Sequence, residues 1–243
     1  KLGKDHAAVD LLQAHIDALR VNLAYSRNEP RQHVIELGEK TLEKFSPDNL
    51  LIRTNTLFTL ALTYLDTGEL ESSARSLEQA RTAAFMGGNA FQVLLADSFR
   101  IYLARLRGDL QSAKAMCRQG RQSVRQAFVD AGRLSEKMLG FYDLHRAYFL
   151  YESNQLSQAA AALEKAMDAV ELVEETYARL MAYQLAFLLR LHTGVDPDSV
   201  LAPLEEMEQL AIYCSQARPL AGSLRIRYDI ERFGKDALML QRA

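Results

Sequence analysis

YLDTGELESSARSLEQA, residues 64–80, is one copy of a pattern that this chain repeats. Residues 104–120 read ARLRGDLQSAKAMCRQG, and residues 150–166 read LYESNQLSQAAAALEKA. Each stretch crosses a turn at a glycine or an asparagine, the residues that most readily adopt the left-handed conformation in which many helices end. A second helix-forming run follows each turn. The pattern therefore predicts a hairpin of two helices, built at least three times.

The second helix of each predicted hairpin carries the same succession of side-chain sizes. A leucine stands two positions after the turn residue, a small residue five after it, a larger buried side chain nine after it and another small residue twelve after it. The small residues let the two helices of a hairpin approach closely. These positions are Leu70, Ser73, Leu77 and Ala80, then Leu110, Ala113, Cys117 and Gly120, then Leu156, Ala159, Leu163 and Ala166.

The turn residues recur at long and nearly regular intervals. Gly108 follows Gly68 by 40 positions, and Asn154 follows Gly108 by 46. Asn28 and Gly194 extend the series by 40 positions at either end. One hairpin cannot bury its apolar face, whereas stacked hairpins share a continuous core. We therefore predict an all-α fold, a right-handed α-solenoid of helix hairpins with repeats of about 40 residues.

Helical periodicity runs along almost the whole chain, and the alternation typical of strands is not sustained anywhere. The scarcity of Gly and Pro, 12 and 5 residues, also favours helices. The predicted helices span residues 5–27, 30–45, 48–66, 69–86, 89–107, 110–131, 134–153, 156–172, 174–193, 198–215 and 218–232. We expect them to form a single superhelical domain over residues 1–243.

Composition indicates an ordinary folded protein outside the membrane. Hydrophobic residues make up 49% of the chain and charged residues 25%, and no run approaches the roughly 18 apolar residues that span a bilayer. The N-terminal residues lack the apolar run of a signal peptide. We expect a cytoplasmic protein without membrane contact. Since the sequence begins with Lys1 rather than Met, we also expect a fragment of a longer protein.

The sequence gives little support for catalysis, metal binding or nucleic-acid binding. The five histidines are not spaced as helical zinc ligands, and neither Cys117 nor Cys214 has a neighbouring His. A net charge of -2 provides no bulk attraction to nucleic acid. No paired acid and base can be placed. We therefore predict no enzyme activity, no metal, no cofactor and no direct contact with nucleic acid from this chain.

The hairpins resemble the tetratricopeptide repeat (TPR). The packing positions that match are Leu60, Ala61, Tyr64, Gly68, Leu77 and Ala80. Leu57 replaces the usual Trp, the Pro that ends the repeat is missing, and the spacing exceeds the standard 34 residues. The hairpins must therefore have longer helices than the standard repeat.

A more specific resemblance is carried by HVIELGEKTLE (33–43), TAAFMGGNAF (82–91), LRGDLQSA (106–113) and YDLHRAYFLYESNQLSQAAAALEKAM (142–167). These stretches resemble the superhelical sensor domain of MalT-type transcriptional activators, the LuxR-family STAND regulators. The resemblance covers roughly residues 18–215. It implies a longer protein with an NTPase switch, a winged helix, this superhelix and a C-terminal helix-turn-helix. This chain contains no GxxxxGK[ST] loop and no evident terminal helix-turn-helix, so NTPase and DNA-binding activities would belong to other segments.

In TPR-like arrays the first helix of each hairpin lines the concave groove. Counting back from each turn residue gives inward positions that carry aromatic and polar side chains, as a small-molecule or peptide site requires. The predicted ligand-binding residues are Asn22, Tyr25, Asn55, Phe58, Ser98, Tyr102, Arg105, Phe141, Tyr148, Tyr151, Glu152 and Gln184. The alternative is that the tyrosines pack between helices with solvated hydroxyls.

The resemblance implies an effector-sensing and protein-interaction domain of a MalT-like regulator. A small-molecule inducer or a regulatory protein would bind in the groove and control activation of the full-length protein. The other domains of the same regulator are expected partners, and self-association is possible. The alternative is a general TPR-like scaffold that binds a peptide or a partner protein. Binding of a metabolite would favour the first function, and binding of a defined polypeptide would favour the second.

Overall fold

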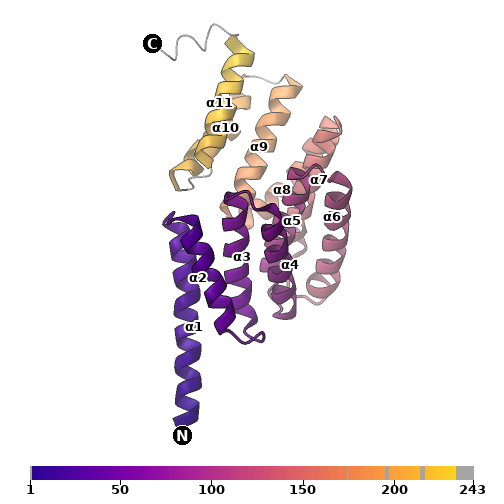
Figure 1. Ribbon diagram of the computed structural model, residues 1–243. Coiled ribbons are helices and arrows are strands. Elements are labelled where there is room, and N and C mark those ends of the chain that lie inside the picture. Colours follow the sequence, from indigo (N-terminus) through magenta and orange to yellow (C-terminus); the bar gives the residue numbers. More distant parts are fainter. Residues whose placement is uncertain (1, 174, 195–196, 214–216, 234–243) are drawn as a thin grey trace. The chain divides into compact units, whose positions relative to one another are not determined.

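A computed structural model describes residues 2–173, 175–194, 197–213 and 217–233 (Figure 1). These residues form eleven α-helices and no β-strand, which confirms the predicted all-α helical repeat. The helices are α1 (Leu2–Ser26), α2 (Arg31–Lys44), α3 (Leu50–Asp66), α4 (Leu70–Met86), α5 (Ala90–Leu106), α6 (Leu110–Val124), α7 (Gly140–Glu152), α8 (Leu156–Val173), α9 (Thr176–Thr193), α10 (Pro197–Tyr213) and α11 (Ala217–Phe233). Cys214 and the predicted end of helix 198–215 lie outside the described residues.

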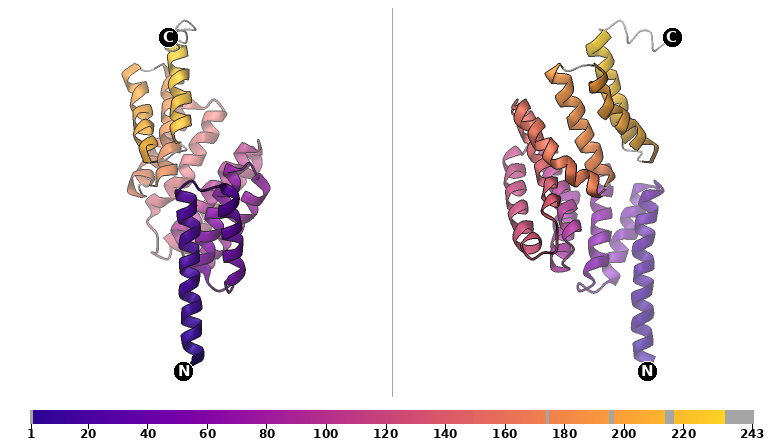
Figure 2. Two further views of the ribbon diagram at one scale, coloured as in Figure 1. Left: turned by 60° about the vertical axis from the view of Figure 1, so that its left-hand side comes forward. Right: turned by 180° about the vertical axis from the view of Figure 1, so that it is seen from behind.

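The chain divides into two compact units, residues 1–134 and 135–243. The first unit contains the hairpins α1–α2, α3–α4 and α5–α6, and the second contains α7–α8, α9–α10 and the single helix α11. Within each unit, every helix packs against the next along the chain. In addition α1 packs against α3, and α7 against α9. We call α1, α3, α5, α7, α9 and α11 the first helices, and α2, α4, α6, α8 and α10 the second helices. Figures 1 and 2 show that α1 projects beyond its shorter partner α2.

The predicted turn residues all adopt the left-handed conformation. Their φ angles are 54° at Asn28, 80° at Gly68, 75° at Gly108, 57° at Asn154 and 66° at Gly194. At the second turn, the Glu69 amide donates to the Tyr64 carbonyl at 2.8 Å and the Gly68 amide donates to the Leu65 carbonyl at 3.1 Å. This pair of bonds satisfies carbonyls at the helix end and defines a Schellman motif. The same pair recurs after α1, α5 and α7.

The predicted small and large positions of the second helices are buried. Ser73, Ala113 and Ala159 lie in the core, and the Ser73 hydroxyl donates to the Ala61 carbonyl of the preceding helix at 2.8 Å. Such a contact requires the close approach that a small residue permits. The larger side chains Leu77, Cys117 and Leu163 are also buried. The packing of each hairpin therefore follows the pattern seen in the sequence.

The predicted boundaries differ most from the structure between α6, predicted to end at 131, and α7. The sequence places a helix over 134–153, but α7 begins at Gly140. Before it, α6 passes into a π-helical turn at Arg125–Val129, Gly132 takes a φ of 68°, and a 3-10 turn covers Glu136–Leu139. The Arg133 and Leu134 amides both donate to the Phe128 carbonyl, and Ser135 is extended with a ψ of 139°, so the helix begins after residue 134. The longer connection between α6 and α7 accommodates the extra residues of the 46-residue interval.

Candidate functional site

The first helices of the first unit share contacts at the predicted groove positions. The Thr59 hydroxyl of α3 donates to the Asn22 side chain of α1 in a short hydrogen bond, and it also lies 3.1 Å from the Asn55 carbonyl. Phe58 of α3 meets Phe99 of α5 edge-on, with ring centroids 5.3 Å apart. These contacts place Asn22, Asn55 and Phe58 on adjoining helices, and all three side chains are partly exposed.

The remaining predicted residues of the first unit differ in depth. Ser98 is buried within α5, whereas Tyr102 and Arg105 of the same helix are partly exposed. Tyr25 near the end of α1 is partly exposed, and the Arg31 guanidinium lies over its ring at 4.8 Å. Ser98 therefore supports the helix packing, and the other side chains reach the surface.

In the second unit, two predicted residues lie in the interior. Phe141 is 2% exposed and Tyr148 is 5% exposed. The Tyr148 hydroxyl donates to the Met181 carbonyl at 2.7 Å, and the Gln184 side-chain oxygen lies 3.1 Å from the same hydroxyl. Tyr148 thus packs α7 against α9, as in the alternative given for the tyrosines, but its hydroxyl is bonded within the protein and not solvated. Gln184 beside it is partly exposed, and Glu152 is exposed.

Tyr151 of α7 begins a chain of hydrogen bonds that continues through His192 of α9 to Arg227 of α11. Its hydroxyl lies 2.9 Å from Nδ1 of His192 in α9, and Nε2 of His192 lies 3.1 Å from the guanidinium of Arg227 in α11. Because Arg can only donate, Nε2 must accept, so a neutral His192 carries its proton on Nδ1 and donates it to Tyr151. Burial raises the pKa of Tyr151.

The predicted set of binding residues omitted His192 and Arg227. The count from Gly194 does give His192 as an inward position, two before the turn residue as Glu152 is before Asn154, but only Gln184 of that helix was included among the predicted binding residues. Arg227 has no such signal, because no turn residue follows α11 among the described residues.

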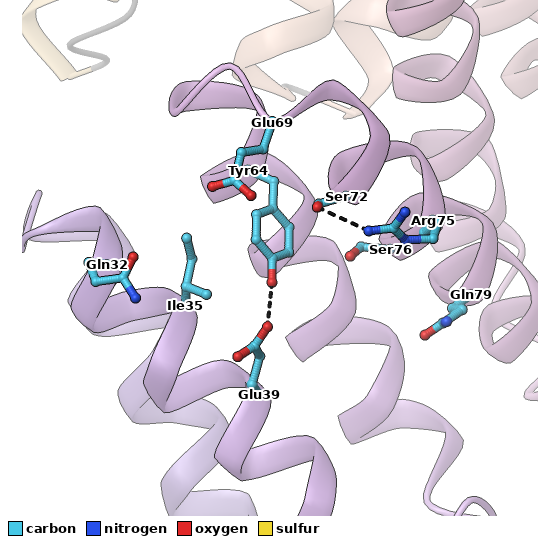
Figure 3. A pocket seen from close by; sticks show the side chains of 9 residues that line it. All are labelled: Gln32, Ile35, Glu39, Tyr64, Glu69, Ser72, Arg75, Ser76 and Gln79. Atoms are coloured by element: carbon cyan, nitrogen blue, oxygen red, sulfur yellow. Dashed lines mark hydrogen bonds between the residues drawn. The ribbon is translucent and has the colours of Figure 1, made fainter.

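A polar cleft of about 450 Å³ lies on the side of the second helices in the first unit (Figure 3). Helices α2 and α4 flank it, and Tyr64 at the end of α3 lies between them. The polar side chains that line it include Gln32, Glu39, Tyr64, Glu69, Arg75 and Gln79. Figure 3 shows the Tyr64 hydroxyl directed at Glu39, to which it donates at 2.7 Å. The positions counted for the groove could not reveal this cleft, because they lie on the first helices.

The Tyr64 phenol is held in its neutral form. Burial is the main cause that raises its pKa, and the hydrogen bond to the Glu39 carboxylate raises it further. A phenolate at this place would be poorly solvated and would lie beside a negative charge. The cleft therefore presents one carboxylate already bound to a phenol, with Gln and Arg side chains around it.

We expect Tyr64 to remain protonated as the pH passes about 10, the ordinary pKa of tyrosine. The difference in phenolate absorbance between the unaltered chain and Tyr64→Phe, followed through alkaline titration, measures this group. Glu39→Gln should move its titration to lower pH, since the variant removes a negative charge beside the phenol. Glu43→Gln, an exposed change elsewhere on α2, should leave it in place. Titration of Tyr64 in the ordinary range would contradict the burial described here.

The described residues offer no alternative centre for metal chemistry. Among them, no group of three or more His, Cys, Asp or Glu side chains is placed to hold a metal ion.

None of the described helices combines the length and apolar character needed to cross a membrane.

Comparison with known proteins identifies the architecture. None of the curated proteins matches the chain. Residues 14–230 match the family described as the MalT-like TPR region, a helical repeat domain and not a catalytic fold. This match confirms the resemblance expected from the sequence, and it extends beyond residues 18–215 at both ends. Because it spans most of the 243 residues and agrees with the hairpins described above, the chain belongs to the MalT-like TPR family.

Proposed function

We propose that this chain is the effector-sensing and protein-interaction domain of a MalT-like, LuxR-family transcriptional regulator of the STAND class. A small-molecule inducer or a regulatory protein binds the face that the first helices form within a unit. Binding there controls activation of the full-length protein. Family membership supports the assignment to such a regulator. The observation that carries the sensing role is the mixture of aromatic and polar side chains on the first helices of both units.

The partly exposed members of this face suit a ligand. They are Asn22, Tyr25, Asn55, Phe58, Tyr102 and Arg105 in the first unit, and Tyr151 and Gln184 in the second. Aromatic rings bury apolar parts of a ligand, and amide, hydroxyl and guanidinium groups fix its orientation. A ligand that spans neighbouring helices touches more than one hairpin. It therefore favours the arrangement of hairpins to which it binds more tightly, as a sensor requires.

The buried predicted residues support this face from below. Tyr148 bonds to α9 beside Gln184, and Phe141 fills the interior of the second unit. Tyr148→Ala would remove a buried ring and weaken the fold, so it cannot separate binding from stability. Tyr102 and Arg105, which are partly exposed, are better probes.

Thermal unfolding of the chain against sugars, organic acids, nucleotides and short peptides tests the proposal. A ligand at a hundred times its Kd adds about 2.7 kcal/mol, which raises the Tm by about 5 to 10 °C for a chain of this size. We expect Tyr102→Ala with Arg105→Ala to abolish the shift and to lower the Tm of the free chain by much less than loss of a core residue. Arg118→Ala, an exposed change on α6, should leave the shift intact.

The results of thermal unfolding distinguish an effector-sensing domain from a scaffold that binds a partner protein. A shift that survives the double substitution would remove the first helices of the first unit as the site. A shift with peptides alone would favour the TPR-like scaffold that binds a partner protein. A chain that no compound stabilises would contradict sensing by this domain on its own.

A further inference from the structure

An apolar opening of about 440 Å³ lies in the second unit, on the side of its second helices. Helices α8 and α10 flank it and α9 forms its floor. It corresponds to the polar cleft of the first unit, which α2 and α4 flank and α3 closes from below. Gly194 follows Gly68 by 126 positions, and Asn154 follows Asn28 by the same number, so residues of the two regions can be paired directly.

One difference between the two regions is the replacement of a leucine by an alanine at the floor of the opening. In the first unit, Leu60 is buried against Gly38, so closely that a Cβ on Gly38 would lie 2.6 Å from the Leu60 side chain. The paired residues in the second unit are Ala186 and Glu164. Ala186 is too short to fill the space that Leu60 fills, and it remains partly exposed. The walls left around it are Leu163, Met167, Tyr183, Leu189 and Pro203.

Pro203 fixes one wall and engages the arginine of the opening. It lies inside α10 and has no amide hydrogen, so the Ser199 carbonyl lacks its usual helical donor. The Arg190 guanidinium of α9 donates to this carbonyl at 2.6 Å. This bond joins α9 to α10 beside the opening. One side of the Arg190 guanidinium therefore faces the backbone of α10.

Two carboxylates line the opening without an ion partner. Glu164 of α8 and Glu206 of α10 are exposed, and within the described part of the chain neither forms an ion pair or a hydrogen bond. Tyr183 also lines the opening, and its ring accepts the Arg179 guanidinium at 5.9 Å from the centroid. The opening thus combines apolar walls, two acidic side chains, one arginine bonded to the Ser199 carbonyl and an aromatic ring that already attracts a cation.

We propose that this opening binds a small organic cation, an ammonium group carried on an aromatic or short alkyl body. The body lies among Leu163, Tyr183 and Leu189, and the ammonium lies beside Glu164 and Glu206. The volume falls within the range of small-molecule sites, about 300 to 1,000 Å³. The opening lies on the side of the second helices and includes none of the residues proposed to bind the effector, so this inference does not rest on the function proposed above.

Binding of phenethylammonium to the whole chain, followed by NMR chemical-shift changes, tests the charge requirement. Phenethyl alcohol and phenylacetate are the neutral and anionic comparisons with a similar body. We expect the ammonium to bind about tenfold more tightly than the alcohol, because two exposed carboxylates each contribute a modest attraction, and the anion to bind least. Glu164→Gln with Glu206→Gln should remove the preference for the ammonium, and Glu171→Gln, elsewhere on α8, should keep it.

A larger side chain at position 186 tests whether the ligand binds in this opening. Ala186→Leu places the side chain present at Leu60 in this space and should weaken binding of both the ammonium and the alcohol more than tenfold. The Tm of the variant is measured alongside, because Glu164 has the Cβ that Gly38 lacks beside Leu60. Ala161→Leu, an exposed change on α8 outside the opening, should leave binding unchanged. Equal affinity for ammonium and alcohol would overturn the proposal. So would binding that survives Ala186→Leu, or the absence of any ammonium-dependent shift.

Discussion

Gly140→Ala is expected to destabilise the chain by about 1 to 3 kcal/mol, although it adds one methyl group. A Cβ at Gly140, at the start of α7, would lie 2.7 Å from the Cβ of Ala169 and 3.3 Å from the Lys165 carbonyl oxygen, both in α8. Neither neighbour can rotate away, because one is backbone and the other is a methyl group fixed to it. The variant must therefore force α7 and α8 apart along a fully buried contact.

Gly222→Ala in α11 is the matched control. A Cβ at Gly222 would meet no atom within 4 Å, and the residue is exposed. The same chemical change should here stabilise the chain by up to about 1 kcal/mol, since alanine loses less conformational entropy in a helix than glycine. Chemical unfolding followed by circular dichroism measures both variants, with separate transitions fitted if the repeats unfold in stages. A harmless Gly140→Ala would show that α7 and α8 do not approach so closely.

The hairpins could be predicted from the sequence because their signals are local. A left-handed residue such as Gly68 ends one helix, and Ser73 and Leu77 then set how closely the next helix packs. All of this lies within about ten residues of the turn. The predicted helix over 69–86 accordingly differs from α4 by one residue.

The depth of the candidate binding residues could not be predicted in the same way. Counting back from Asn154 indicates which face of α7 carries Tyr148, but its burial depends on Met181 and Gln184 of α9. The count from Asn154 places both Tyr151 and Tyr148 among the inward positions of α7. In the structure Tyr151 is partly exposed, whereas Tyr148 is in the interior. Burial is set by a neighbouring helix more than thirty positions away, which periodicity within one helix does not report.

The difference between the two openings also depends on residues far apart in the sequence. Glu164 and Ala186 both line the opening between α8, α9 and α10, whereas the paired residues Gly38 and Leu60 pack against each other in the first unit. Each residue alone is ordinary for a helix. Only the superposition of equivalent hairpins shows that a large side chain is missing from one of them.

Asp97→Ala is expected to cost about 3 kcal/mol, more than the other substitutions considered for the first unit. The Asp97 carboxylate, 2% exposed on α5, accepts from Nε of Arg81 in α4 at 2.6 Å and from Nη1 of Arg100 at 3.0 Å. Arg100 also pairs with Glu78 of α4. Removal of the carboxylate would leave the largely buried Arg81 guanidinium without its acidic partner and Arg100 with Glu78 alone, and a buried charge without a partner is strongly unfavourable.

Comparison with an exposed pair distinguishes burial from charge alone. Glu71 bonds to Arg107 at 3.1 Å, but its side chain is 79% exposed, so Glu71→Gln should change the free energy of unfolding by less than about 0.5 kcal/mol. Arg81→Ala combined with Asp97→Ala should cost less than the sum of the single changes, because the double variant removes both members of the pair. Additive costs in chemical unfolding would mean that Asp97 supports the fold by filling space. A cost near that of Glu71→Gln would mean that the carboxylate and its arginines remain solvated.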